Sequence, residues 1–333
     1  MPRLVHALRH TALLVQCIAL AAAAAPVEGP EQWLQRMDDA LGTLDYRGEF
    51  SYLNGRDLSS LSIRHAILDG VARERLTHLD GPPRELIRTG DDLLCVMRRG
   101  DPLAELGRQV PTGPITRSFV GGFSVVPEAY RARAAGEGRI ARRSARVIEL
   151  LPVDDSRYGY RLWIDAETAL PLRSELLDPS GRALEVFQFV NLEVGGSFSL
   201  ADFAPPAGDQ LEIQRIVFAD GAPSGDRPIE EAWEAGWLPG GFAMAARDLR
   251  RLPFATAPVD ALLYSDGLAS FSVFVERLVG HAGYDHSSQL GGTVAVVRRL
   301  EMPDDRRWLV TVVGEVPLAT AERVARSVQP RGD

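Results

Sequence analysis

Lysine is absent from this chain, so every cationic side chain other than histidine is an arginine. The absence excludes Schiff-base chemistry and lysine nucleophiles. Genomic base composition, which also favours the many Ala, Gly and Arg residues, is a simpler cause than function. Arginine does suit bidentate contacts with phosphates and carboxylates, but pairs such as Arg142-Arg143 are also typical of solvated strand ends.

Cysteine is nearly absent as well. The two cysteines are Cys17, inside an N-terminal apolar run, and Cys95, inside the apolar run 93–97. If the N-terminal run is removed, no internal disulfide is possible, and a hydrophobic core must hold the protein together. We interpret Cys95 as a buried, inert thiol, with intermolecular pairing as the alternative.

Basic charge is also scarce: 37 basic residues face 45 acidic ones, for a net charge of −8. This balance argues against nucleic acid as a partner. The 333-residue length exceeds a typical single domain and favours two.

Catalytic and metal-binding motifs are missing. The chain has six histidines and no Gly-x-Ser-x-Gly, His-Glu-x-x-His or Gly-x-x-x-x-Gly-Lys pattern. His281 and His286 lie in one Gly- and Ser-rich turn without a matching ligand cluster. His65 and His78 follow strand patterns and are interpreted as hydrogen-bonded sheet residues. We therefore expect a binding protein that is not an enzyme and uses no metal or cofactor.

The N-terminus predicts export. Arg3 and Arg9 precede an apolar run over residues 11–25 that ends in an alanine tract, as in a secretory signal peptide. No second apolar run of membrane-spanning length follows. We expect residues 1–25 to be a cleaved signal peptide and the mature protein to be periplasmic. Acylation at Cys17 is the alternative, but Gln16 is a poor small-residue neighbour.

The rest of the first half predicts one amphipathic helix and an antiparallel meander. In residues 30–44, Trp33, Met37, Leu41 and Leu44 fall on one helical stripe. Short alternating runs separated by tight-turn residues then predict nine strands without intervening helices, which bend toward a barrel. The predicted strands are 46–53, 58–68, 71–79, 84–88, 93–98, 146–152, 158–165, 170–177 and 182–192.

Two segments interrupt this pattern. Residues 99–137 show no clear strand period and are rich in Gly and Pro, which is typical of a lid or binding loop. Residues 204–230 are interpreted as an interdomain linker, within which 211–218 could form a short strand or helix. Beyond them, strands at 242–249, 261–264, 268–278, 293–300 and 308–316 and a final helix at 317–328 predict a small α+β domain.

Several N-terminal strands are apolar beyond what one helix could cover. We therefore predict that one face of the sheet forms a concavity that holds an apolar ligand. The candidate lining residues are Phe50, Tyr52, Ile63, Leu86, Val96, Trp163, Phe187 and Phe189.

Five ordered segments resemble one family. They are Asp80-Gly-Pro-Pro-Arg-Glu85, Tyr158-Gly-Tyr-Arg-Leu-Trp-Ile-Asp165 with Leu170-Pro-Leu-Arg173, Trp237-Leu-Pro-Gly-Gly-Phe242, Tyr264-Ser-Asp-Gly-Leu268 and Val313-Gly-Glu-Val-Pro317. Together, from about Trp33 to Val328, they resemble the MucB/RseB family of periplasmic negative regulators of the sigma-E (AlgU-type) envelope-stress response. Residues 99–137 do not align with the family.

The resemblance implies a mainly β chain in two parts. Residues 27–205 would form an unclosed antiparallel β-barrel like those of the lipoprotein carriers LolA and LppX, residues 206–230 a linker, and residues 231–333 a smaller α+β domain. The family binds the periplasmic part of a MucA/RseA-type membrane anti-sigma factor and shields it from the site-one protease. Lipopolysaccharide or another lipid signal is thought to release it.

Candidate anchors for that partner lie in the second domain: Trp237, Phe242, Tyr264 and Phe271, where Phe242 and Phe271 could equally be core residues. A periplasmic lipid or lipoprotein carrier is the alternative function, although a carrier has no evident need for residues 237–328. The chain leaves open whether it forms a homo-oligomer.

Overall fold

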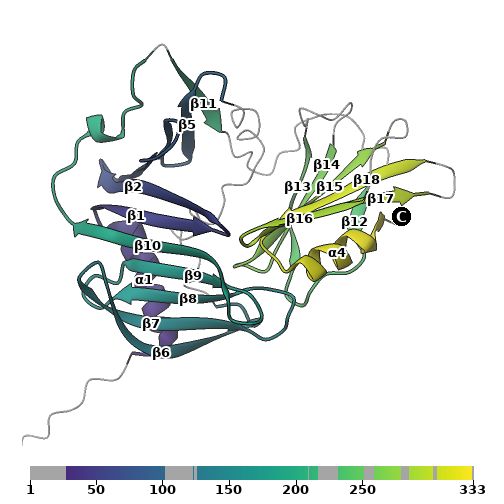
Figure 1. Ribbon diagram of the computed structural model, residues 1–333, viewed down its shortest axis with the longest axis horizontal. Coiled ribbons are helices and arrows are strands. Elements are labelled where there is room, and N and C mark those ends of the chain that lie inside the picture. Colours follow the sequence, from purple (N-terminus) through teal and green to yellow (C-terminus); the bar gives the residue numbers. More distant parts are fainter. Residues whose placement is uncertain are drawn as a thin grey trace, which may run out of the picture.

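The computed structural model describes residues 28–101, 123, 126–208, 210–216, 232–250, 259–278, 285–302 and 306–331. The predicted signal peptide and most of the predicted lid lie outside these ranges. The described residues form two units, each built on its own antiparallel sheet (Figure 1).

The N-terminal unit is an eleven-stranded antiparallel sheet with the order β11-β5-β4-β3-β2-β1-β10-β9-β8-β7-β6. Its edge strands β11 and β6 do not pair with each other, so the predicted unclosed antiparallel barrel is confirmed. The strands are β1 (Tyr46–Asn54), β2 (Asp57–Leu68), β3 (Val71–His78), β4 (Arg84–Thr89), β5 (Asp92–Arg98), β6 (Tyr130–Ile140), β7 (Arg143–Pro152), β8 (Gly159–Asp165), β9 (Pro171–Leu177), β10 (Ala183–Val194) and β11 (Leu211–Ile216).

One helix packs against this sheet. Helix α1 (Pro30–Thr43) begins with Pro at its first turn, where a missing N–H costs nothing. Its apolar stripe lies in the same buried cluster as the inward side chains of β1, β2, β8 and β10. The buried residues of α1 are Trp33, Leu34, Met37, Ala40 and Leu41. A short 3-10 helix, η1 (Leu200–Phe203), follows β10.

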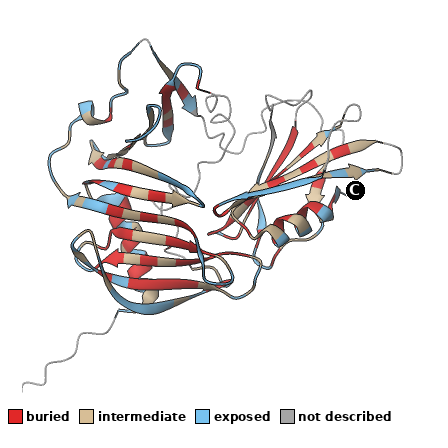
Figure 2. Cartoon of the chain, in the orientation of Figure 1, coloured by how far each residue is buried: buried red, intermediate tan, exposed pale blue. Residues whose placement is uncertain are grey.

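Burial alternates along the strands, as Figure 2 shows by its red and pale bands. In β1 the pattern places Tyr46, Phe50 and Tyr52 inward. Register continues this face across the sheet, since Ile63 of β2 pairs with Leu76 of β3, which pairs with Leu86 of β4. Alternation thus produces one apolar face and one polar face, as the sequence pattern predicts.

Three strands fall where the sequence predicts irregular structure. One is β16 (His286–Leu290) of the C-terminal unit, which begins in the predicted Gly- and Ser-rich turn; it is an edge strand whose residues are all exposed, so it shows no apolar alternation. Part of β6 lies inside the expected insertion 99–137, and that expectation is wrong for residues 130–137. β6 is an edge strand with many small or charged exposed residues and a bulge at Gly136, where φ is +108°. An edge strand exposed in this way has no apolar period to detect.

The third such strand is β11, which lies inside the predicted linker 206–230. It pairs with β5 over six residues and extends the N-terminal sheet. The short strand considered for residues 211–218 therefore forms, although it belongs to the sheet. Most of the remaining linker residues, 217–230, lie outside the described residues.

The C-terminal unit is a six-stranded antiparallel sheet covered by one helix. Its order is β13-β14-β15-β18-β17-β16, and a small β12-β19 pair lies beside it. The elements are β12 (Trp233–Ala235), β13 (Ala243–Arg250), β14 (Val259–Ser265), β15 (Ser270–Arg277), β16 (His286–Leu290), β17 (Thr293–Glu301), β18 (Arg307–Gly314), α4 (Leu318–Ser327) and β19 (Val328–Pro330). This is the predicted small α+β arrangement.

A glycine in β1 makes room for the aromatic core. A Cβ on Gly48 would lie 2.5 Å from the Asn191 carbonyl oxygen and 2.7 Å from the Phe189 ring. The adjacent register shift between Glu49 and Phe50 leaves the backbone little freedom to retreat. Any side chain at position 48 must therefore push Phe189 out of place.

We expect Gly48→Ala to lower the free energy of unfolding by about 1–3 kcal/mol, because it overpacks a filled core. The matched control is Gly42→Ala, since a Cβ on Gly42 of α1 meets nothing within 4 Å. That variant should be neutral or slightly stabilised. Urea unfolding of both proteins measures the difference, and equal stabilities would contradict the packing argument.

Candidate functional site

The predicted cavity lining divides into two groups. Phe50, Tyr52, Ile63, Phe187 and Phe189 all belong to the buried cluster on the inner face of the N-terminal sheet. Three of the rings meet edge to face, with centroids 4.8 Å apart for Phe50 and Phe187 and 5.0 Å apart for Phe187 and Phe189. The structure thus brings five of the eight candidates together.

The other three candidates are not members of this cluster, and only Leu86 packs against it. Leu86 is partly buried and contacts both the main cluster and the small cluster of Cys95 and Met97. Val96 pairs with Glu85 and so lies on the opposite face of the sheet from Leu86. Trp163 also lies on the opposite face, where the Arg173 guanidinium carbon sits 5.0 Å from its ring centroid. Val96 and Trp163 therefore do not line the inner face.

The inner face is covered in this conformation. Helix α1 contributes Trp33, Leu34 and Met37 to the same cluster. Phe123, a residue of the expected lid, is buried with its ring centroid 5.4 Å from that of Tyr160, and Val126 packs against the cluster. The other apolar lid residues, Leu103, Leu106, Ile115, Phe119 and Val125, lie outside the described residues.

The predicted partner anchors are mostly interior. Phe242, Tyr264 and Phe271 are buried in the core of the C-terminal unit, with ring centroids 5.2 Å apart for Phe242 and Phe271 and 5.4 Å apart for Tyr264 and Phe271. The Tyr264 hydroxyl accepts a hydrogen bond of 3.0 Å from the Ala235 N–H. These three side chains are not surface anchors in this conformation.

Trp237 is different, because it is only partly buried. It packs at the edge of the C-terminal core, and the Arg323 guanidinium carbon lies 3.8 Å from its ring centroid. Arg323 comes from α4. Trp and Arg are enriched among residues that dominate binding energies, so this stacked pair keeps the properties of a candidate anchor.

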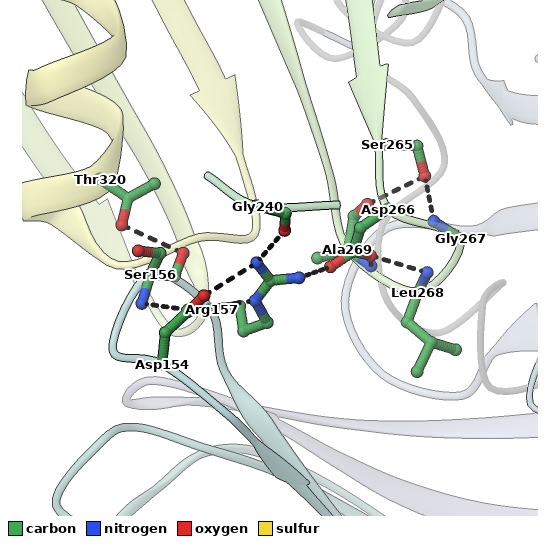
Figure 3. A network of polar contacts seen from close by, with 10 residues as sticks. All are labelled: Asp154, Ser156, Arg157, Gly240, Ser265, Asp266, Gly267, Leu268, Ala269 and Thr320. Carbon is green, nitrogen blue, oxygen red and sulfur yellow. Dashed lines mark hydrogen bonds and ion pairs between the residues drawn. The ribbon is translucent and has the colours of Figure 1, made fainter. Parts of the chain in front are cut away.

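The contact surface between the two units, called the seam below, holds a network of buried polar contacts that sequence reasoning missed. Arg157, in the turn between β7 and β8, has a side chain that is 0% exposed. Its Nη1 donates to Asp266 Oδ2 at 2.5 Å and its Nη2 donates to the Gly240 carbonyl oxygen at 2.5 Å. Nε and Nη2 also donate to the two carboxylate oxygens of Asp154, each at 3.2 Å. Figure 3 shows this network, with Asp266 and Gly240 coming from the C-terminal unit.

The turn that carries Asp266 also crosses the seam. The Asp266 carboxylate accepts hydrogen bonds from the Leu268 and Ala269 N–H groups, at 2.9 and 2.7 Å, and so shapes the turn between β14 and β15. This places the Leu268 side chain in the buried cluster of the N-terminal unit. A residue of one unit therefore completes the core of the other.

The turn between β16 and β17 makes the other contact. Glu185 of β10 is 3% exposed; its Oε2 accepts from the Tyr52 hydroxyl at 2.6 Å and its Oε1 accepts from the Gly292 N–H at 2.8 Å. Burial raises the pKa of this carboxyl to about 7, and the charge of Glu315 acts in the same direction, whereas the two hydrogen bonds oppose the shift. A carboxyl with this pKa titrates near neutral pH.

The sequence carries a partial signal for this seam. Three of the five segments that resemble the family lie on it: Tyr158 follows Arg157, Gly240 belongs to 237–242, and Asp266 and Leu268 belong to 264–268. Nothing in a single sequence shows that they meet, because Arg157 and Asp266 are 109 positions apart.

The histidines considered as candidates have structural roles where they are described. His65 is 2% exposed; one ring nitrogen bonds the Leu44 carbonyl oxygen at 2.8 Å, and the ring stacks on Tyr46. Burial lowers the pKa of His78. His281 lies outside the described residues. Within those ranges, His, Cys, Asp and Glu side chains nowhere group in a way that could hold a metal ion, and no helix is long and apolar enough to cross a membrane.

We expect Arg157→Met to destabilise the protein by about 3–5 kcal/mol, because it leaves the buried Asp266 carboxylate without its cation. The matched control is Arg47→Met, which breaks a bidentate pair with Glu193 that lies on the surface. The control should change stability little, because water screens that pair. Thermal unfolding compares the variants, and similar melting temperatures would show that the seam does not depend on Arg157.

Known proteins share this organisation. A model of the MucB/RseB N-terminal domain matches residues 29–207, and one of the MucB/RseB C-terminal domain matches residues 227–329. The sigma factor AlgU regulatory protein MucB of Pseudomonas aeruginosa is 39% identical over 325 residues, covering 97% of this chain and 98% of that protein. The sigma-E factor regulatory protein RseB of Escherichia coli is 31% identical over 313 residues, covering 92% of each.

Solved structures of MucB also match this chain. The complex of P. aeruginosa MucA and MucB matches with a TM-score of 0.73 at 37% identity, covering 91% of this chain and 99% of that one. A crystal structure of MucB matches with a TM-score of 0.61 at 34% identity, covering 91% of this chain and 98% of that one. Both units of this chain are thus matched in sequence and in structure, and the chain belongs to the MucB/RseB family.

Proposed function

We propose that this protein is a periplasmic regulator that binds the periplasmic part of a MucA/RseA-type anti-sigma factor and thereby controls an envelope-stress sigma factor. The observation that carries this proposal is the match of both units to MucB, including the structure of MucB in complex with MucA. The TM-score is also higher for that complex than for the crystal structure of MucB, each match covering 91% of this chain. The conformation described here is therefore close to one that holds the partner.

The finer steps of the proposal are protection of the anti-sigma factor from site-one proteolysis and release by a lipid or lipopolysaccharide. The inner face of the N-terminal sheet supports a lipid role, because its buried side chains are aromatic and aliphatic. That face is filled by α1 and completed by Leu268. An acyl chain can enter only if α1, Leu268 or the covering residues Phe123 and Val126 are displaced.

Binding of the partner should depend on the stacked pair Trp237 and Arg323. We expect Trp237→Ala to weaken binding of a MucA-type periplasmic domain by about 1–3 kcal/mol, as removal of an aromatic anchor does. Isothermal titration calorimetry with the purified partner domain measures the change.

A matched control is available in Trp163→Ala. Trp163 is also a partly buried tryptophan that stacks against an arginine, but it lies on the outer face of the N-terminal sheet. This variant should bind the partner as the parent does. A folded Trp237→Ala protein with undiminished affinity would move the interface elsewhere, and absence of any binding by the parent would overturn the proposed function.

Lipid should compete with the partner. Burial of about ten methylenes contributes roughly 8 kcal/mol before ordering costs, more than the roughly 5.5 kcal/mol that reverses a two-state equilibrium. We expect lipopolysaccharide to dissociate the preformed complex with the partner domain, as followed by analytical ultracentrifugation. If lipid occupies the protein while the complex stays intact, the release mechanism is wrong although anti-sigma binding stands.

A further inference from the structure

The contact between the β16–β17 turn and the N-terminal sheet is too close for ordinary side chains. A Cβ on Gly291 would lie 1.8 Å from Asn54 Oδ1, and a Cβ on Gly292 would lie 2.2 Å from Leu176 Cδ2 and 2.9 Å from Glu185 Oε1. Gly291 also has a φ of +55°, which glycine adopts without strain. The two glycines allow the turn backbone to reach the Glu185 carboxyl.

Within the described part of the chain, the carboxyl at this contact has no cation to balance its charge. From the N-terminal unit, Tyr52 of β1 donates to it and Tyr158, just before β8, interacts with its charge, as it does with that of Asp178 after β9. From the C-terminal unit, Gly292 donates its N–H, and Glu315, just after β18, adds a second negative charge. The groups around Glu185 are thus neutral donors and acids.

We propose that the β16–β17 turn is a proton-dependent clasp between the two units, closed when Glu185 is protonated and loosened when it is ionised. Closing the turn over Glu185 removes water from the carboxyl, and this favours its neutral form. Opening the turn returns water to it. The closed state therefore binds a proton more tightly than the open state. Closing of the turn and protonation of Glu185 thus favour each other.

The direction of the effect follows from the pKa. In the closed state the pKa of Glu185 is about 7, against an ordinary value of 4.5. Between these two values the closed state holds a proton that the open state releases, so closure weakens as the pH rises toward 7 and no longer depends on pH well above it. If opening restored the ordinary pKa completely, the closed-to-open ratio would fall by about 300-fold.

The contacts of Arg157, at the other end of the seam, should not change between the pH values of 4.5 and 7 over which Glu185 titrates. Arg157 is held by Asp266, Asp154 and the Gly240 carbonyl oxygen, and arginine does not lose its proton in proteins. The seam therefore has one end whose cation keeps its charge and one end that titrates. Ionisation of Glu185 would let the β16–β17 end swing while the Arg157 end stays joined.

The test measures the separation of the units in the full mature chain without any partner. Spin labels are placed on cysteines that replace Ser197 and Ser288, one in each unit and both exposed, in a Cys95→Ala background. Double electron–electron resonance at pH 5.5 and 8.5 should show one short distance at the lower pH. A longer distance should grow at the higher pH, with at least a tenfold change in the ratio.

Two variants test whether the pH response comes from Glu185 or from a general weakening of the contact between the units. Glu185→Gln keeps the shape without a titrating group, since its amide oxygen can accept from the Gly292 N–H and its NH2 can donate to the Tyr52 hydroxyl. It should therefore show the short distance at both pH values. Gly292→Ala cannot seat against Leu176, so it should show the long distance at both. An unchanged distribution in the parent, or a pH response that survives in Glu185→Gln, would overturn the clasp.

The clasp and the proposed function can fail separately, because the distance measurement involves no anti-sigma factor. If the proposed function holds, the closed state should be the one that binds, since the conformation described here is closer to the MucA complex. Glu185→Gln should then bind a MucA-type domain with an affinity that no longer changes between pH 5.5 and 8.5.

Discussion

The arrangement of the molecule depends on one buried guanidinium. Arg157 has no exposed surface, and a charge removed from water is costly unless it is paired and hydrogen-bonded. Its partners come from both units: Asp154 from the first, Asp266 and the Gly240 carbonyl from the second. Separation of the units would leave either this cation or the Asp266 carboxylate partly unpaired, so the seam resists opening at this end.

The same residue connects the two hydrophobic cores. The Arg157 guanidinium carbon lies 5.7 Å from the ring centroid of Tyr130, in the N-terminal core, and 5.2 Å from that of Phe242, in the C-terminal core. The turn held by Asp266 inserts Leu268 into the N-terminal core. A rearrangement of the N-terminal core therefore changes the surroundings of residues in the unit that carries Trp237. Packed side chains thus connect the lipid site proposed in the N-terminal core with the partner site proposed at Trp237.

Sequence alone was sufficient for the regular parts of this fold. Period-two alternation located most strands of both sheets because each sheet has one buried face, and the apolar stripe of α1 gave its range. β6 and β16 were missed because an exposed edge strand has no such alternation. Val96 and Trp163 were assigned to the wrong face because strands that are apolar on both sides do not show which side is inward.

The seam was beyond the reach of sequence reasoning for a different reason. Buried and exposed aromatic residues look the same in a sequence, so Phe242, Tyr264 and Phe271 could not be told apart from surface anchors. Glu185 lies in a strand where a charged residue normally faces water, and the hairpin of the other unit reaches its carboxyl through a contact that no local pattern predicts. Arg157 and Asp266 meet through tertiary structure, and no local pattern anticipates a pair 109 positions apart.

The filled state of the inner face constrains how lipid and partner can be coupled. Protein interiors are packed closely enough that an acyl chain cannot be added to a complete core without displacing something. Here the groups that cover the inner face are α1, Phe123, Val126 and Leu268, and Leu268 is held by the Arg157 network. If the protein binds lipid as proposed, the acyl chain must therefore enter a conformation different from the closed one described here. A ligand shifts an equilibrium only by its difference in affinity for the two states, and a core that excludes lipid when closed makes that difference large. If lipid displaces Leu268, occupation of the core and the present closure of the Arg157 end of the seam exclude each other, and this would couple lipid binding to release of a partner that requires the closed form.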